Sequence, residues 1–356
     1  MNYKDELIAN VKKLTQEGKG ILAADESTGT LKKKFDKINL ECSDENRRAY
    51  RELLITTEGL EQYISGIILF EETVYQKTAQ GEAFIEILNK KGITPGIKLD
   101  KGMAQLSWNP EETFTKGFDT LDERAAAFYK AGCRFAKWRN VLKLGKDMPS
   151  DLSIRETSYT LARYAHICQR NGLVPIVEPE LLTDGEHSIE VCADTSRKIF
   201  KTVFKACEEY GVIFEGCLFK PHMITQGAQN QSQTSAQEIA KHTFAVLNDT
   251  LPEKLGGVFF LSGGQSELQA TANLNAINKE KLKHGKHWHL SFSYGRALQN
   301  SVVAAWNGKP ENVKKAQEVL IQRAKMNFKA CKGEYNPSEE SSDFKDESMY
   351  EKNYSY

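Results

Sequence analysis

The 356-residue chain lacks an excess of either charge. It carries 48 lysine and arginine residues and 48 aspartate and glutamate residues, so its formal net charge is zero. This balance excludes the broad basic field that is typical of nucleic-acid-binding proteins and the acidic excess of disordered chains. We therefore expect no nucleic-acid partner. A negatively charged ligand must be bound by a local cluster of cations.

Cysteine pairs with the spacing of metal or redox motifs are also missing. The seven cysteines form an odd set without a CxxC pair. This pattern argues against a disulfide framework and a zinc site, and it favours a reducing cytosol, so we predict a cytoplasmic protein. Four histidines show no ligand spacing with one another: His166, His187, His222 and His242. We predict no metal and no cofactor.

Long hydrophobic runs and dinucleotide-binding glycines are the last notable absences. The first residues, MNYKDELIANVKKL, contain no apolar run long enough for a signal peptide or a membrane span. No GxGxxG motif follows the first predicted strand, which argues against a dinucleotide-binding open sheet.

Eight short apolar runs alternate with helical patterns. The predicted strands are GILAAD (20–25), SGIILFEE (65–72), GIKLD (96–100), RFAKWR (134–139), LVPIVEPE (173–180), FEGCLFK (214–220), GGVFFLSGG (256–264) and HLSFSYG (289–295). Helices are expected over residues 4–17, 43–57, 122–132, 150–171, 188–210, 236–248, 266–277 and 310–330. The alternation predicts an α/β protein with a parallel sheet, and eight units favour one closed (β/α)8 TIM barrel. An open, doubly wound sheet is the alternative.

The last residues differ in composition from the rest. We predict one barrel domain over residues 1–333, including an N-terminal helix, and a mobile C-terminal tail over 334–356. The stretch PSEESSDFKDESMYEKNYSY is acidic and polar, which is typical of a mobile segment. Its tyrosines at 350, 354 and 356 either dock loosely on the barrel or close over a site.

Charged side chains stand at the ends of five predicted strands. Because side chains alternate along a strand, parity places one set on the inner face of the barrel: Asp25, Lys98, Lys137, Arg139, Glu178, Glu180 and Lys220. In a (β/α)8 barrel the carboxyl ends of the strands carry the active site. These charges are therefore expected to meet at one mouth of the barrel.

Two interpretations of this cluster compete. It could be an internal ion-pair network that only neutralises itself. Alternatively, a lysine that is crowded by other cations and partly desolvated becomes a nucleophilic amine, and an amine that attacks a ketone gives a Schiff base. Neighbouring carboxylates can then transfer protons. Six lysine and carboxylate charges from five strands favour catalysis, and the constellation suits aldol cleavage or condensation without a metal.

Two segments have the features of phosphate sites. Ser262, Gly263 and Gly264 join a strand to a helix, and Arg296 follows Gly295 at the end of the eighth predicted strand. Backbone N–H groups at a helix start and a guanidinium both bind phosphate well, and the loops after strands seven and eight are the usual phosphate site of such barrels. After the first strand, the hydroxyls and lysines of 27–34 are either a solvated helix face or a second phosphate site.

Eight motifs carry a resemblance to a known family: ILAADEST, GIKLDKG, FAKWR, VPIVEPE, LFKP, FLSGGQSE, NLNAIN and SFSYGRAL. Together they resemble class I fructose-1,6-bisphosphate aldolase, from about Gly18 to Gly333. The resemblance implies a (β/α)8 barrel, usually a homotetramer, which cleaves fructose 1,6-bisphosphate into dihydroxyacetone phosphate and glyceraldehyde 3-phosphate in glycolysis and gluconeogenesis. The resemblance also implies an alternative scaffold role, in which the basic mouth of the barrel binds actin or acidic peptides. A further alternative is a Schiff-base aldolase for another sugar bisphosphate.

The resemblance also implies roles for individual residues. Lys220 would form the Schiff base, Glu178 would be its general acid and base, and Asp25 would assist carbon–carbon cleavage. Lys137 and Arg139 would contact substrate, Lys137 would also favour the neutral amine of Lys220, and Glu180 and Lys98 would complete the charge network. One phosphate would be bound by Ser262, Gly263, Gly295 and Arg296, and the other would lie near Ser27, Thr30, Lys33 and Lys34. Tyr356 would transfer a proton at the enamine carbon.

The sequence departs from the family pattern at the second phosphate site. Thr30 stands where a serine is expected and keeps a hydroxyl. Lys34 stands where an arginine is expected, and a lysine lacks the bidentate fork. The residues before Tyr356 also differ from the pattern, although the tail has a similar length. The phosphate contacts near the first strand are therefore the weaker expectation.

Overall fold

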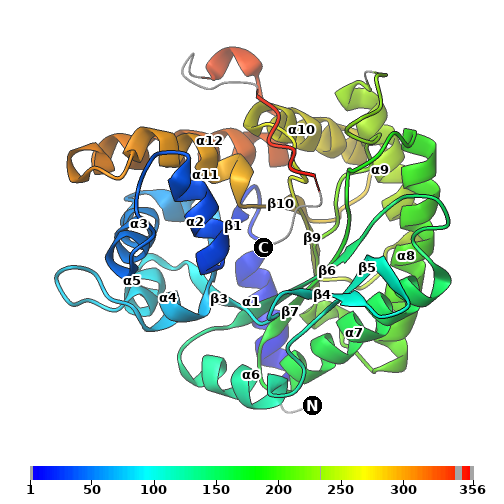
Figure 1. The fold of residues 1–356 in the computed structure, drawn as a ribbon, viewed down its shortest axis with the longest axis horizontal. Helices are drawn as coiled ribbons and strands as arrows, with labels where there is room; N and C mark the ends of the chain where they lie inside the picture. Colours follow the sequence, from blue (N-terminus) through cyan, green and yellow to red (C-terminus); the bar gives the residue numbers. More distant parts are fainter. Residues whose placement is uncertain (1–2, 233, 341–346, 353–356) are drawn as a thin grey trace.

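The computed structural model describes residues 3–232, 234–340 and 347–352. Eight parallel strands close a barrel in the order β1-β10-β9-β8-β7-β6-β3-β2, and helices surround it (Figure 1). The barrel strands are β1 (Gly20–Ala24), β2 (Ile64–Leu69), β3 (Thr94–Lys98), β6 (Phe135–Leu142), β7 (Val174–Leu181), β8 (Leu218–Phe219), β9 (Gly257–Phe260) and β10 (Leu290–Tyr294). Two further strands, β4 (Met103–Leu106) and β5 (Asn109–Thr115), form a separate sheet. The predicted (β/α)8 barrel is confirmed.

The helices follow the strands along the chain. They are α1 (Lys4–Leu14), α2 (Thr28–Asp36), α3 (Asp44–Thr56), α4 (Glu71–Tyr75), α5 (Phe84–Lys91), α6 (Leu121–Lys130), α7 (Asp151–Arg170), α8 (Ile189–Glu209), α9 (Ala236–Thr250), α10 (Glu267–Lys283), α11 (Arg296–Trp306) and α12 (Val313–Cys331). Short 3-10 turns are η1 (Leu60–Gln62), η2 (Phe214–Gly216), η3 (Pro310–Asn312) and η4 (Pro337–Glu339). No helix of the described residues has both the length and the hydropathy to cross a membrane.

Serine caps explain where many of these helices begin. A serine hydroxyl accepts a hydrogen bond from the backbone N–H three residues later at the start of α2, α3, α7, α8, α9 and α10. Such caps satisfy a donor that the first helical turn leaves free. Ser235 and Glu238 form the predicted capping box of α9, and Ser266 and Gln269 form another at α10.

The barrel interior is apolar below the charged strand ends. An inner cluster contains Ile21, Ala23, Ile68, Phe135, Val174, Ile176, Leu218 and Phe259, together with Leu7, Val11 and Leu14 of α1. The ring of Phe135 fills the space above Gly96, where a Cβ atom would lie 2.3 Å from that ring, so only glycine fits there. Helix α1 thus closes the barrel end that lies opposite the predicted site.

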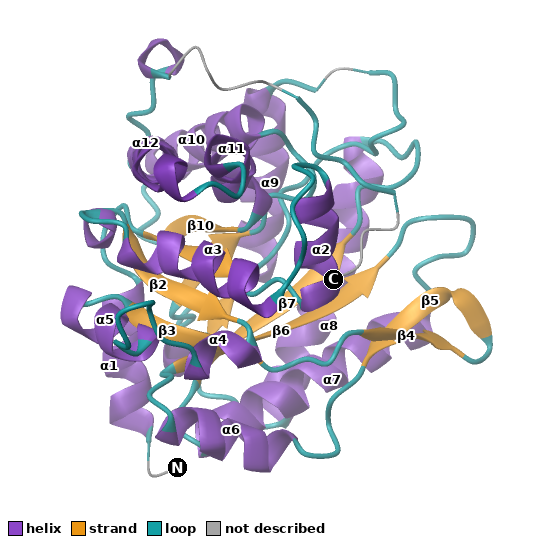
Figure 2. Cartoon of the chain, turned by 60° about the vertical axis from the view of Figure 1, so that its left-hand side comes forward, coloured by secondary structure: helices purple, strands orange, loops and turns teal. Residues whose placement is uncertain are grey.

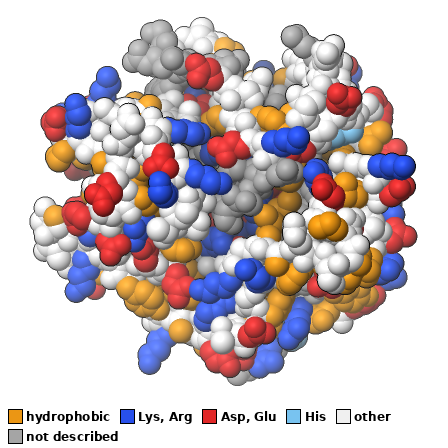
Figure 3. All heavy atoms as spheres, viewed as in Figure 1, with side chains coloured by type: hydrophobic (Ala, Val, Ile, Leu, Met, Phe, Trp, Pro, Cys, Tyr) orange, Lys and Arg blue, Asp and Glu red, His pale blue; other side chains and the backbone are white. Residues whose placement is uncertain are grey.

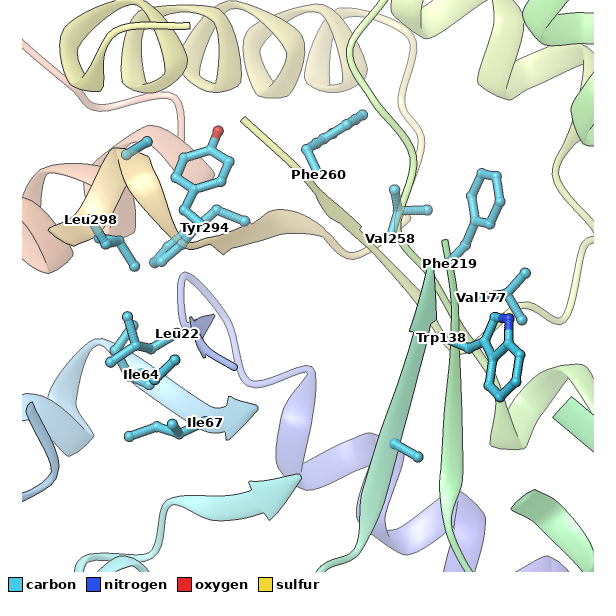
Figure 4. Close-up of a cluster of buried hydrophobic side chains, with 14 of the residues drawn as sticks. Leu22, Ile64, Ile67, Trp138, Val177, Phe219, Val258, Phe260, Tyr294 and Leu298 are labelled. Atoms are coloured by element: carbon cyan, nitrogen blue, oxygen red, sulfur yellow. The ribbon is translucent and has the colours of Figure 1, made fainter. Parts of the chain in front are cut away.

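A second, larger core lies between the strands and the surrounding helices. Figure 4 shows part of it, with Trp138, Val177, Phe219 and Val258 side by side on the outer face of β6–β9. Trp138, Val177 and Phe219 each stand next in sequence to inward-facing residues, because strand side chains alternate. The parity prediction is confirmed, since Lys137, Ile176 and Leu218 lie on the inner face.

Several strand predictions need correction. The segment 256–264 was expected to be a strand, but β9 ends at Phe260. The segment 214–220 was expected to be a strand throughout, but Phe214–Gly216 form η2 and only Leu218–Phe219 pair as β8. The Gln169 side chain bonds to the backbone of Ile213 and Gly216, which replaces strand pairing there. The predicted strand 65–72 ends at Leu69, because Glu71 and Glu72 begin α4, where helix starts favour acidic residues.

The sequence reasoning missed several elements. The antiparallel hairpin of β4 and β5 lies outside the barrel, beyond the end of β3 (Figure 2). Helices α2, α4, α5 and α11 were also not predicted. The boundary predicted between residues 333 and 334 stays a prediction. Helix α12 ends at Cys331, and η4 follows it.

Candidate active site

The charged residues at the strand ends converge, as parity predicted. Asp25 follows β1, Lys98 ends β3, Lys137 and Arg139 lie in β6, Glu178 and Glu180 lie in β7, and Lys220 follows β8. All seven side chains are buried, and Lys137, Glu178 and Lys220 are 0%, 1% and 3% exposed. Buried charges must be paired or they cost several kcal/mol.

Glu178 is the centre of this cluster. Its Oε1 atom lies 3.1 Å from Lys220 Nζ, and its Oε2 atom lies 3.6 Å from Lys137 Nζ. Lys137 Nζ also lies 2.7 Å from Asp25 Oδ2. A single chain of alternating charges therefore runs from Lys220 through Glu178 and Lys137 to Asp25. A proton on the Lys220 amine has a carboxylate within direct reach.

Two further ion pairs flank this chain. Lys98 pairs with Asp100, and Arg139 pairs with Glu180. Burial would raise the pKa of Glu180, but Arg139, with Arg296 and Lys220 beyond it, lowers that pKa below its usual value. Burial opposes ionisation of Asp100 in the same way, and Lys98 and Lys137 lower its pKa. Both carboxylates are thus held ionised beside the cluster.

A cavity of about 410 Å³ opens above these residues. Asp25, Glu178, Glu180 and Lys220 lie in its wall, together with residues of the β9–α10 and β10–α11 loops. Lys98, Lys137 and Arg139 are not among the lining residues; they contact Asp100, Asp25, Glu178 and Glu180 from below. Lysine and arginine side chains surround the centre of this face of the molecule (Figure 3).

The predicted phosphate loop after β9 lies on one side of the cavity. Ser262 and Gly263 line it, and Gly263 and Gly264 have φ angles of 56° and 82°, which glycine adopts without strain. Gly295 precedes α11, and Arg296 is the first residue of that helix. Arg296 reaches the cavity, so the structure brings together all four residues predicted for the first phosphate.

The residues predicted for the second phosphate lie at the start of α2 and along it, on the other side of the cavity. Thr30, Lys33 and Lys34 line the cavity, whereas Ser27 is not among the lining residues. The Ser27 hydroxyl instead caps α2, where it accepts from the Thr30 N–H at 3.3 Å. Lys32 points to solvent and pairs with Asp36, so the solvated-face reading holds for that lysine.

Lys34 is engaged by a buried network that sequence reasoning missed. Its Nζ pairs with Glu26, and Glu26 also accepts from Arg51 Nη1 at 2.7 Å. Burial would raise the pKa of Glu26, but Lys34 and Arg51 lower it to about 2. Gln299 of α11 joins the network: it accepts from the Tyr50 hydroxyl at 2.8 Å and donates to Ala23 O. The position of Glu26 beside Asp25 was the available signal.

The part of the tail that the structure describes also reaches this cavity. Residues 347–351 line it, and Met349 N donates to Gly264 O at 3.0 Å. Arg296 Nη1 donates to Met349 O at 2.7 Å. The Tyr350 hydroxyl donates to Asp184 Oδ1 at 3.0 Å and accepts from Gln229. Tyr356, the predicted proton-transfer residue, lies outside the described residues.

The amine, carboxylates and anion-binding loops together suit Schiff-base chemistry on a phosphorylated ketone. Among the described residues, no group of three or more histidine, cysteine, aspartate or glutamate side chains could hold a metal ion. The histidine nearest to this site in sequence, His222, is engaged by Ser196 and by the backbone of Leu181.

Comparison with known proteins agrees with this chemistry. The family model described as fructose-bisphosphate aldolase class-I matches residues 6–356. Cytosolic fructose-bisphosphate aldolase 4 of Arabidopsis thaliana is 54% identical over 99% of this chain and 89% of its own length. The cytoplasmic isozyme of Spinacia oleracea is 52% identical over 99% of this chain and 98% of its own. The predicted cytoplasmic location agrees with these relatives' names.

A solved structure is similar throughout. Fructose-bisphosphate aldolase from Plasmodium falciparum, in complex with TRAP and a small molecule inhibitor, has a TM-score of 0.92 and 54% sequence identity. The match covers 94% of this chain and 96% of that one. Because the family model and these relatives extend over nearly all of the sequence, the chain belongs to the class-I fructose-bisphosphate aldolase family.

Proposed function

We propose that the chain cleaves fructose 1,6-bisphosphate reversibly into dihydroxyacetone phosphate and glyceraldehyde 3-phosphate, with Lys220 as the Schiff-base nucleophile. The observation that carries this assignment is the 3.1 Å separation between Lys220 Nζ and Glu178 Oε1 in the wall of a cavity with cations on both sides. The relatives named as fructose-bisphosphate aldolases support the substrate.

The first half of the reaction builds the Schiff base. The neutral amine of Lys220 attacks the ketone carbon of the open-chain sugar, and the carbonyl oxygen takes up a proton to give a carbinolamine. Glu178 accepts the proton that the nitrogen loses and returns a proton to the departing hydroxyl, which leaves as water. Lys137 lies behind Glu178, 3.6 Å from its Oε2 atom, and is assigned to the charge network that supports this step.

The second half breaks the carbon–carbon bond. A base takes the proton of the C4 hydroxyl, the C3–C4 bond breaks, and its electron pair moves into the iminium to give an enamine. Asp25 lines the cavity and is assigned to this step. After the aldehyde leaves, Tyr356 protonates C3, and water releases dihydroxyacetone phosphate from Lys220. Tyr356→Phe should slow turnover far more than it weakens substrate binding, and equal effects would argue against its role.

The two phosphates lie at opposite sides of the cavity. One is assigned to Ser262, Gly263, Gly295 and Arg296, and the other lies near Ser27, Thr30, Lys33 and Lys34. Arg296 Nη1 donates to Met349 O, so a phosphate bound to Arg296 would replace a contact with the tail. Lys34 already pairs with Glu26, and Lys33 is therefore the less encumbered cation on α2. Arg139 and Lys98 are assigned to substrate contacts. Glu180, which pairs with Arg139, is assigned to the charge network around the site.

Rates of cleavage test the nucleophile. Lys220→Met should lower the rate by more than ~10³-fold, as expected when a covalent nucleophile is lost. Lys254→Met is the control, because the Lys254 side chain is 73% exposed. Cleavage by the parent should persist with EDTA. A Lys220→Met protein with the parental rate, or a parent that EDTA inactivates, would contradict the assignment.

Assembly and partner binding are the remaining parts of the proposal. The homotetramer follows from family membership, and analytical ultracentrifugation should give four times the chain mass; a monomer at working concentration would contradict it. The Plasmodium relative was solved with TRAP, which favours protein binding by this family. For an actin or acidic-peptide partner at the basic mouth, fructose 1,6-bisphosphate should compete with binding, and an unaffected affinity would place the partner elsewhere.

A further inference from the structure

Lys220 follows a strand of only two residues. Strand β8 contains only Leu218 and Phe219, which pair with Ile176 and Val177 of β7. Lys220 N donates to Val177 O at 2.9 Å, and this is the last backbone bond from β8 to β7 before the chain leaves the ladder. The proposed nucleophile therefore lies where the pairing of β8 with β7 ends.

Strand β7 continues beyond this point. The next backbone N–H groups on its edge toward β8 therefore need other hydrogen-bond acceptors. The residues on the edge that faces β8 alternate with period two, so Pro179 and Leu181 follow Val177. Pro179 has no N–H group. Leu181 is buried, and its N–H would lack a strand partner because β8 has already ended. A buried donor without an acceptor costs free energy.

The imidazole of His222 supplies the missing acceptor. Its Nδ1 atom accepts from Leu181 N at 3.3 Å. Because Nδ1 accepts, the proton of the neutral ring is assigned to Nε2, which lies 2.8 Å from Ser196 Oγ of α8 and donates to that hydroxyl. The ring is 4% exposed and packs against Phe200, with 5.6 Å between the ring centroids.

This contact joins the two residues of the proposed chemistry. His222 lies two residues after Lys220, and Leu181 lies three residues after Glu178. The imidazole therefore ties the segment that carries the nucleophile to the strand that carries its acid and base. His222 is not among the residues that line the cavity, so it reaches substrate only through these two segments.

We propose that His222 is a positioning residue that holds Lys220 at its distance from Glu178 through the Leu181 N–H. The inference rests on the proposed roles of Lys220 and Glu178. Proton transfer between the amine and the carboxylate depends on their separation, and a misplacement of about 1 Å costs up to ~10²-fold in rate. The phosphate loops after β9 and β10 do not depend on this contact, so substrate affinity should change little.

Two isosteric variants separate the two hydrogen bonds of the ring. In His222→Asn, the amide oxygen can replace Nδ1 and keep the Leu181 contact, while the Ser196 contact is lost. In His222→Gln, the longer side chain can reach Ser196 and loses the Leu181 contact. Ser196→Ala removes the Ser196 contact of the ring and keeps the Leu181 contact. The readouts are kcat and KM for fructose 1,6-bisphosphate and the thermal unfolding midpoint.

We expect kcat of His222→Gln to fall by about 10- to 100-fold at a nearly constant KM. His222→Asn and Ser196→Ala should keep kcat within about threefold of the parent. Equal losses of kcat in the Asn and Gln variants overturn the proposal, and so does a Gln variant that lowers only the unfolding midpoint. If the Gln variant does not fold, a loss of more than threefold in His222→Asn overturns it.

Borohydride trapping of dihydroxyacetone phosphate separates this inference from the proposed function. An adduct that maps to Lys220 in both the parent and His222→Gln leaves the kcat comparison as the test of His222. An adduct that maps to another lysine in the parent removes the basis of the inference, because the nucleophile itself is then wrong.

Discussion

At the scale of single residues, Glu178 has two partners with different consequences. One of its oxygens contacts the proposed nucleophile Lys220, and the other contacts the buried cation Lys137. A carboxylate in this position can exchange protons with the amine and remain charge-compensated while it does so. The same group thus balances the charges of the cluster and lies within reach of its proposed proton-transfer partner.

Replacing Glu178 by glutamine tests this dual role. Glu178→Gln keeps the side-chain volume but removes the exchangeable proton, so kcat should fall by roughly 10²- to 10⁴-fold while KM changes little. Steady-state cleavage rates measure the effect. Glu186→Gln is a control on the loop after β7, outside the cavity lining. An unchanged kcat for Glu178→Gln would rule out its acid–base role.

At the scale of elements, Glu26 connects the first strand to two helices. It follows β1 and pairs with Lys34 of α2 and Arg51 of α3. Arg51 is 1% exposed, and the carboxylate of Glu26 compensates its buried positive charge. The network holds α2, which carries residues proposed for the second phosphate, against the barrel.

Removal of the Glu26 charge should therefore destabilise the fold. Glu26→Gln leaves Arg51 buried beside an uncharged amide, which should lower the free energy of unfolding by about 3–5 kcal/mol. Urea denaturation at neutral pH measures it. Asp36→Asn at the end of α2 removes a solvent-exposed pair with Lys32 and should have little effect. Similar effects of the two variants would contradict the buried network.

At the scale of the whole molecule, the barrel was readable from the sequence because eight strand patterns alternate with helical patterns. Period-two parity then placed the charges on one face. Contacts between distant segments were not readable. The Glu26–Arg51 pair and the bond from the Leu181 N–H to His222 depend on the packing of elements that parity does not place. The β4–β5 hairpin was missed because residues 109–115 are mostly polar. The short length of β8 was also not readable, because it depends on the contact of the Gln169 side chain with the distant backbone of Ile213 and Gly216.

Acid stability follows from a buried histidine. Burial lowers the pKa of His222 from 6.5 to about 4, and the nearby Glu180 carboxylate only partly offsets this effect. Between these values the unfolded chain binds a proton that the folded chain does not, so stability falls as pH falls from 6.5 to 4. The loss from this group is on the order of 3 kcal/mol. His222→Asn should flatten this part of the stability–pH curve, and parallel curves for parent and variant would contradict the assignment.

The most direct measurement of the central claim is borohydride reduction in the presence of dihydroxyacetone phosphate, followed by peptide mapping. The account predicts one covalent adduct on the peptide that contains Lys220, in the presence of EDTA as in its absence, and no adduct in Lys220→Met. Trapping that persists in Lys220→Met, or an adduct that maps to Lys137 or Lys98, would contradict it.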